Sequence, residues 1–176
     1  MNIVIVNGSA RVKGRTGIVS RHIQRKYGVE LIDLSQLNLP IYNGEEEQYG
    51  LAEVKHLVEM ISNADGIILA SPEYHSGMSG ALKNALDFLG SKQFSHKPVA
   101  LLAAAGGGKG GINALNNMRV VARGLYANVI PRQLVMDPNC FDYEKDGLLA
   151  DADVLAKQLV DELRMYVKIH ASIMEK

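Results

Sequence analysis

The amino-terminal stretch, residues 1–17, reads MNIVIVNGSARVKGRTG. It begins with a run of β-branched residues, Ile3–Val6, and passes directly into a loop rich in glycine, arginine and hydroxyl side chains. A strand that is apolar on both sides must be covered by helices on both faces of its sheet, as in parallel sheets. This stretch therefore predicts the first strand, the first loop and the start of the first helix of an α/β protein.

Short β-branched runs alternate with segments of helical spacing along the rest of the chain. We expect strands at 3–6, 29–34, 66–70, 98–104 and 128–136. We expect helices at 16–27, 51–62, 78–90, 111–124 and 151–174, with 142–153 as a solvated connection before the last helix. Alternating strands and helices joined by right-handed crossovers form a doubly wound sandwich. The predicted fold class is a flavodoxin-like three-layer α/β sandwich, with helices on both faces of a five-stranded parallel sheet of order 2-1-3-4-5.

Length and composition limit the function classes. The chain has 176 residues, which predicts one domain over residues 1–176. Its 19 basic and 19 acidic side chains cancel to a formal net charge of zero, so the basic excess of a nucleic-acid binder is missing. The longest apolar run, Val99–Ala105, is much shorter than a membrane span, and no secretory signal follows Met1. We expect a cytoplasmic protein that binds neither nucleic acid nor membrane.

The loop after the first predicted strand has the composition of a phosphate site. Ser9 and Thr16 supply hydroxyl donors, while Arg11 and Arg15 supply charge and fork-shaped donors. The next helix adds free N–H groups and the positive end of its dipole. The alternative is a polar surface loop in which Thr16 caps the helix. The hydroxyl donors and arginines favour a phosphate monoester as the ligand. Neither a Walker A motif nor a G-x-G-x-x-G fingerprint is present, which argues against a P-loop and a dinucleotide site.

Two further loops should meet the first at the carboxyl ends of the strands. Ser71–Gly77 offers an aromatic ring and several polar groups, and it fits either a planar heteroaromatic ligand or a Pro-initiated turn in which Ser76 or Ser79 caps the next helix. Ala105–Gly111 is mostly glycine, so either its backbone approaches a ligand closely or it is a flexible surface loop. Taken together, the three loops fit a flat ring on a phosphorylated chain, which is the shape of FMN.

The motifs of these loops resemble one known family. The segments that carry the resemblance are Gly8-Ser9-Ala10-Arg11, Ser71-Pro72-Glu73-Tyr74-His75 and Gly80-Ala81-Leu82-Lys83-Asn84-Ala85-Leu86-Asp87. They are similar to the NADPH-dependent FMN reductase family of azoreductases, quinone reductases and chromate reductases, and most of all to the azobenzene reductase type of Bacillus. The resemblance spans nearly the whole chain. It implies a flavodoxin-like fold, non-covalent FMN and a homodimer or homotetramer, with helices 78–90 and 111–124 as the expected contact surfaces.

The resemblance also assigns cofactor-binding residues. It implies a phosphate site made of Ser9, Arg11, Arg15, Thr16 and Gly17. It implies ribityl and ring contacts from Pro72, Glu73, Tyr74, His75 and Ser76. It implies a loop beside the pyrimidine edge of the ring made of Gly106, Gly107 and Gly108. Many members have a shorter first loop, so the division of phosphate contacts among Lys13, Arg15 and Thr16 stays open.

The implied activity is that of an oxidoreductase. NADPH, with NADH as the alternative, would deliver two electrons by ping-pong hydride transfer through FMN to azo compounds, quinones, free flavin or similar acceptors. We expect no catalytic side chain and no metal, because the five histidines are widely separated and the lone Cys140 lacks a partner motif. The alternatives are a flavodoxin-like electron carrier, against which the zero net charge argues, and a flavin-binding redox sensor without reductase activity.

Overall fold

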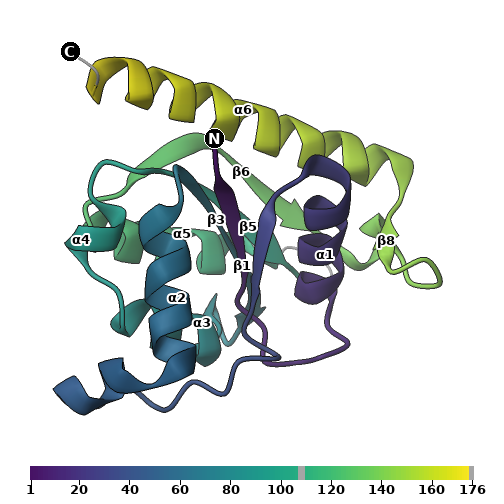
Figure 1. Cartoon of the computed structure of the whole chain (residues 1–176). Coiled ribbons are helices and arrows are strands. Elements are labelled where there is room, and N and C mark those ends of the chain that lie inside the picture. The colour runs from purple at the N-terminus through teal and green to yellow at the C-terminus, as the bar shows by residue number, and fades with distance from the viewer. Residues whose placement is uncertain (107–109, 175–176) are drawn as a thin grey trace.

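The computed structural model describes residues 1–106 and 110–174, and its centre is a twisted parallel sheet (Figure 1). The five strands of this sheet are, in spatial order, β2 (Glu30–Asp33), β1 (Ile3–Asn7), β3 (Gly66–Tyr74), β5 (Pro98–Ala104) and β6 (Asn128–Met136). All four neighbouring pairs are parallel. The two-residue strand β4 (Gly77–Met78) pairs only with β3, antiparallel. Without β4, the order is 2-1-3-4-5, which confirms the predicted topology.

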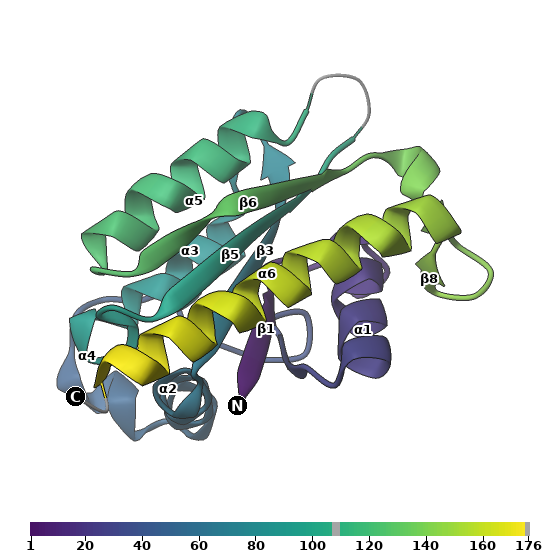
Figure 2. The same cartoon turned by 90° about the horizontal axis from the view of Figure 1, so that it is seen from above.

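Helices cover both faces of the sheet (Figure 2). One face carries α1 (Arg15–Tyr27) and α6 (Ala150–Met174). The other carries α2 (Ala52–Asn63), α3 (Gly80–Asp87), the short α4 (Ser91–Phe94) and α5 (Ile112–Gly124). Two 3-10 turns, η1 (Glu46–Gly50) and η2 (Pro138–Cys140), directly precede α2 and β7 in the chain. The flavodoxin-like three-layer sandwich is therefore confirmed.

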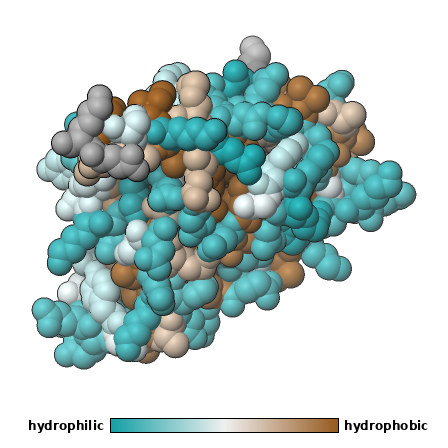
Figure 3. All heavy atoms as spheres, turned by 45° about the horizontal axis from the view of Figure 1, so that its top comes forward, coloured by the Kyte–Doolittle hydropathy of each residue, from teal (hydrophilic) through white to brown (hydrophobic). Residues whose placement is uncertain are grey.

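Alternate residues of each central strand enter different hydrophobic cores. In β1, Val4 and Val6 pack with the α2, α3 and α5 side, whereas Ile3 and Ile5 pack with the α1 and α6 side. All four side chains are buried. Burial on both faces explains why the strand sequence is continuously apolar and does not alternate with polar residues. The face drawn in Figure 3 is mainly hydrophilic, with apolar residues scattered over it. No helix in the described part of the chain is both long and apolar enough to cross a membrane.

The third strand differs from the prediction at its carboxyl end. The expected strand 66–70 continues to Tyr74, because Ser71 and Pro72 pair with Ala103 and Ala104 of β5. Glu73 and Tyr74 then pair back onto β4. The following helix is correspondingly shorter than the predicted 78–90. It begins after Ser79, whose side chain accepts the N–H of Leu82 at 3.0 Å as an N-cap.

The segment 142–153 is not a solvated connection. It contains the antiparallel hairpin of β7 (Phe141–Asp142) and β8 (Gly147–Leu148), which packs on α1. Asp146 in the hairpin turn accepts the Nε–H of Arg21 at 2.8 Å, and this hydrogen bond lowers the pKa of the Asp146 carboxyl. Asp153, in the first turn of α6, is largely buried and accepts a hydrogen bond from the ammonium of Lys26 of α1 at 2.6 Å. The prediction was wrong here because these acidic residues find their partners more than a hundred positions away in the chain.

Candidate active site

A pocket of about 220 Å³ lies at the carboxyl ends of β1, β3 and β5, and we call it the carboxyl-edge pocket. Its lining consists of Ser9, Arg11, Gly14, Arg15, Thr16, Pro72, Glu73, Tyr74, Ala104, Ala105 and Gly106. Predicted cofactor residues from all three loops are thus brought together. Gly14, Ala104 and Ala105 were not among the predicted site residues. Small side chains carry little chemical signal, and only the position of Ala104 and Ala105 at the end of a strand could have indicated them.

The remaining predicted residues lie elsewhere or outside the described part of the chain. Gly17 is buried in the first turn of α1 and is not part of the pocket lining, and a Cβ there would lie 2.9 Å from a terminal nitrogen of Arg21. His75 and Ser76 are exposed in the turn between β3 and β4 and do not line the pocket. Gly107 and Gly108 fall outside the described residues.

The amino terminus of α1 opens onto the pocket without a side-chain cap. Its N-cap residue is Gly14, so the alternative in which Thr16 caps this helix is wrong. The first helical hydrogen bond runs from the N–H of Ile18 to the carbonyl of Gly14, at 3.0 Å. The N–H groups of Arg15, Thr16 and Gly17 therefore precede the hydrogen-bonded turns, and no acidic side chain lies in the first turn. Such a terminus is a site for an anion.

Two arginines add positive charge to this terminus. Arg11 and Arg15 both line the pocket, and neither takes part in an ion pair within the described residues. Guanidinium groups bind phosphate through two parallel N–H donors. Two such groups beside an uncapped helix terminus fit the charge and the donor requirement of a phosphate dianion, so the residues present fit the phosphate of FMN.

The loop that carries Ser9 is held closely against the neighbouring strand. The N–H of Gly8 donates to the carbonyl of Ala70 at 2.7 Å, and a Cβ on Gly8 would lie only 2.5 Å from that oxygen. The hydroxyl of Ser79 donates to the carbonyl of Gly8, and the backbone N–H of Ser79 donates to the hydroxyl of Ser71 at 2.9 Å. The first and second loops of the pocket are therefore fixed to each other, and glycine is required where they touch.

The β3–β4 hairpin forms the side of the pocket that carries an aromatic ring. Its turn residues, His75 and Ser76, have φ values of 48° and 64°. Two successive positive φ angles are typical of the type I′ turn in two-residue hairpins, and residues other than glycine adopt them rarely. Tyr74, at the base of the turn, lines the pocket and is 43% exposed. A flat ligand could therefore pack against a ring that is held by a tight turn.

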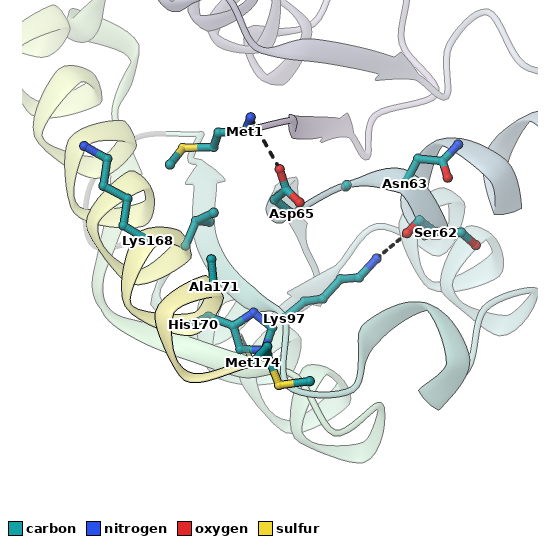
Figure 4. A pocket seen from close by; sticks show the side chains of 11 residues that line it. Met1, Ser62, Asn63, Asp65, Lys97, Lys168, His170, Ala171 and Met174 are labelled. Carbon is teal, nitrogen blue, oxygen red and sulfur yellow. Dashed lines mark hydrogen bonds and ion pairs between the residues drawn. The ribbon is translucent and has the colours of Figure 1, made fainter. Parts of the chain in front are cut away.

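A larger pocket, of about 550 Å³, lies at the opposite edge of the sheet (Figure 4). It includes Asp65 and Lys97, which directly precede β3 and β5. The ammonium of Lys97 donates to the carbonyls of Ile61 and Ser62 at 2.8 and 2.7 Å, and burial lowers the pKa of Lys97. The side chain of Lys97 thus caps the carboxyl end of α2. In doubly wound sheets the ligand lies at the carboxyl ends of the strands, which favours the smaller pocket as the active site.

Comparison with known proteins points to one family. Residues 1–142 match the family model described as NADPH-dependent FMN reductase. The chain is 49% identical to the NADPH azoreductase of Bacillus sp. (strain OY1-2), over 98% of this chain and 96% of that protein. It is 31% identical to the FMN-dependent NADPH-azoreductase of Staphylococcus aureus (strain USA300), with 95% of each chain covered.

Solved structures support the fold. The flavoenzyme NAD(P)H:(acceptor) oxidoreductase FerB from Paracoccus denitrificans superposes with a TM-score of 0.78 at 18% identity, covering 96% of this chain and 98% of that one. A flavodoxin from the domain Archaea superposes with a TM-score of 0.56 at 15% identity, covering 93% and 99%. At these identities the likeness concerns the fold alone.

Proposed function

The chain belongs to the NADPH-dependent FMN reductase family, and on that premise we propose that its carboxyl-edge pocket binds FMN for NADPH-dependent reduction of small acceptors. The observation that carries the proposal is the convergence of an uncapped helix terminus, two arginines and Tyr74 on one pocket at the expected edge of the sheet. The protein is accordingly an FMN-dependent, NADPH-dependent oxidoreductase of the azoreductase type.

The proposed roles follow the lining of the pocket. Ser9, Arg11, Arg15 and Thr16 hold the phosphate, together with the N–H of Gly17. Pro72, Glu73, Tyr74 and Gly106 lie beside the ribityl chain and the ring. The family motif also supports ring contacts from His75, Ser76, Gly107 and Gly108.

The chemistry requires little of the protein beyond binding and orientation. FMN, when bound, supplies two-electron hydride chemistry, and no side chain has to act as a nucleophile. The chain fixes the phosphate at α1 and the ring at the β3–β4 hairpin. The backbone N–H of Gly106, which lines the pocket, is a suitable donor to the pyrimidine edge of the ring.

We propose azo compounds, quinones and free flavin as acceptors, in a ping-pong order that begins with NADPH. Azo compounds are supported by the names of the relatives at 49% and 31% identity. The ping-pong order is supported by geometry, because nicotinamide and acceptor must each approach the same reacting atom to about 3–3.5 Å. Release of the oxidised nucleotide before the acceptor enters avoids this conflict.

A homodimer or homotetramer in the cytoplasm is the proposed state of the protein. The helices that follow the cofactor loops, α3 and α5, are the proposed contact surfaces. On α5, Ile112 and Val120 are 51% and 60% exposed, so apolar side chains project from the face that a second copy would cover.

The function is tested by anaerobic mixing of the FMN-loaded protein with NADPH or NADH, followed by visible absorbance. We expect NADPH to bleach the flavin band and an added azo dye or quinone to restore it. Negligible oxidation of either nucleotide would contradict the reductase and favour the redox sensor. Titration of flavin-free protein should also give much tighter binding of FMN than of riboflavin, because only FMN carries the phosphate.

A further inference from the structure

A chain of hydrogen bonds runs from the end of β2 into the phosphate loop. Asp33 Oδ1 accepts a hydrogen bond from Asn7 Nδ2 at 2.6 Å. Asn7 Oδ1 accepts the N–H of Ser9 at 3.2 Å. Ser9 Oγ in turn accepts the N–H of Arg11 at 3.1 Å. Ser9 and Arg11 line the carboxyl-edge pocket, whereas Asn7 and Asp33 do not.

The carboxylate of Asp33 and the backbone N–H of Ser9 together set the orientation of the Asn7 amide between them. An ionised carboxylate only accepts hydrogen bonds, so the amide of Asn7 must turn its NH₂ group toward Asp33. Its oxygen then faces the N–H of Ser9. Asn7 is 1% exposed, so water does not compete for this amide. Ser35 holds the same oxygen of Asp33 through its N–H at 3.0 Å and its hydroxyl at 2.7 Å.

This series of hydrogen bonds leaves the hydroxyl hydrogen of Ser9, at the pocket end, without an acceptor among the described residues. Because Ser9 Oγ accepts from Arg11, the hydroxyl hydrogen of Ser9 has to find another acceptor, and none occurs within residues 1–106 and 110–174. Ser9 is 1% exposed and lines the pocket. A buried hydroxyl hydrogen requires an acceptor. A phosphate oxygen in the pocket would supply one.

We infer that Asn7 and Asp33 are positioning residues of the phosphate site. They fix the turn from Ser9 to Arg11 so that the Ser9 hydroxyl donates into the pocket. The backbone N–H of Arg11 is already bonded to Ser9 Oγ, so Arg11 contacts the phosphate through its side chain. The inference rests on the proposed FMN site and extends it to two residues that do not touch the cofactor. It predicts that Asn7 and Asp33 act on the phosphate and not on the ring.

The test compares FMN with riboflavin in flavin-free protein, by titration of flavin fluorescence. Asn7→Leu keeps the approximate size of the side chain and removes both hydrogen bonds. We expect it to raise the Kd of FMN by about tenfold or more while the Kd of riboflavin stays within about threefold. Asp33→Asn removes the charge that holds the NH₂ group of Asn7, whereas the N–H of Ser9 still favours the same amide orientation, so a smaller rise in the same direction is expected. If Asn7→Leu fails to fold, Asp33→Asn carries the test.

Two further variants separate positioning from general stability. Ser35→Ala removes a partner of Asp33 but keeps the bond to Asn7, so the Kd of FMN should stay within about threefold. In a Ser9→Ala background, Asn7→Leu should weaken FMN binding less than it does in the unsubstituted protein, because part of its effect passes through the Ser9 hydroxyl. Equal effects of Asn7→Leu in the two backgrounds would overturn the inference.

The outcomes also separate this inference from the proposed function. If the unsubstituted protein binds riboflavin as tightly as FMN, the phosphate site itself is wrong. If FMN is preferred but Asn7→Leu and Asp33→Asn weaken FMN and riboflavin in equal proportion, or weaken neither, the phosphate site stands and the positioning role is wrong.

Discussion

Glu73 Oε2 accepts the backbone N–H of Ala114 at 2.9 Å, which joins the end of β3 to the first turn of α5. Glu73 therefore caps a helix from another segment of the chain as well as lining the carboxyl-edge pocket. The N-cap residue of α5, Gly111, has no side chain that could do this. The bond holds the ring side of the pocket against the helix that follows the glycine-rich loop.

Removal of this cap should cost stability. Glu73→Ala leaves the N–H of Ala114 without its acceptor and removes a negative charge from the positive end of α5, so the free energy of unfolding should fall by about 1–2 kcal/mol. Glu73→Gln keeps an acceptor oxygen and should lose about half as much. Urea unfolding monitored by circular dichroism measures both. Glu59→Ala, at an exposed position of α2, is the control and should change little. A Glu73→Ala protein as stable as that control would contradict the capping role.

The phosphate assignment predicts a selective loss of affinity. Each charged hydrogen bond contributes about 1.5–3 kcal/mol, so Arg11→Ala or Arg15→Ala should weaken FMN binding roughly ten- to a hundredfold. Riboflavin binding should change little in either variant. Arg123→Ala, at an exposed position of α5, is the matched control. Unchanged FMN affinity in both variants would show that the phosphate lies elsewhere.

The sequence predicted the central elements well because their signals are local. β5 and β6 have the bounds expected for them, 98–104 and 128–136: β5 is apolar throughout, and β6 has apolar pairs near its start and at its end, Val129-Ile130 and Val135-Met136, around a polar centre. β3 was predicted too short because Pro72, Glu73 and Tyr74 have the composition of a loop. Only pairing with β5 and β4 makes them a strand, and such pairing is a tertiary interaction.

The site was predictable where side chains carry the chemistry. Arg11, Arg15 and Tyr74 were expected, and they line the pocket. The role of Asn7 could not be found in the sequence, because it depends on a partner, Asp33, that lies 26 positions away in the chain. The β7–β8 hairpin escaped prediction because its two strands are very short and because its Asp146 is held by Arg21 of α1, far away in the chain.

The pairing of Asp146 with α1 predicts a pH-dependent contribution to stability. Its hydrogen bonds with Arg21 lower the pKa of Asp146 in the folded protein. A lowered pKa gives stability that is fully present above the unfolded pKa, near 3.9, and is lost as the pH falls toward the folded pKa. Because Asp146 is partly exposed, we expect Asp146→Asn to cost only about 0.5–1 kcal/mol at pH 7. Asparagine tolerates the positive φ of 48° at this position.

The measurement is urea unfolding of both proteins between pH 7 and pH 3. The difference in unfolding free energy should shrink below about pH 4, where the unfolded carboxyl becomes protonated. High salt at pH 7 should reduce it as well. A difference that stays constant over this range would mean that the carboxylate charge is not its source.

The proposed assembly predicts that a charge on α5 breaks an interface without unfolding the chain. Val120→Glu introduces a carboxylate at a side chain that is 60% exposed in the single chain, so the melting temperature of an isolated copy should hardly change. In a dimer or tetramer that uses α5, the buried charge should favour dissociation. Light scattering at micromolar concentration reads out the mass. Val154→Glu, at a comparably exposed position of α6, is the control. An unsubstituted protein that is monomeric would refute the assembly.

The kinetic order gives a test of how the two substrates use the pocket. If NADPH and the acceptor must each reach the same reacting atom, initial rates at varied NADPH and quinone should give parallel double-reciprocal lines.

Tyr74 lines the pocket, and no proton transfer is assigned to its hydroxyl. Tyr74→Phe should therefore keep most of the activity. Tyr74→Ala removes the ring from a side chain that is already 43% exposed, so it should slow reduction by NADPH and oxidation by quinone with little loss of fold stability. Stopped-flow absorbance measures the two half-reactions separately. Intersecting lines would require a ternary complex and a second substrate site, and a large loss in Tyr74→Phe would assign the hydroxyl a role in the reaction.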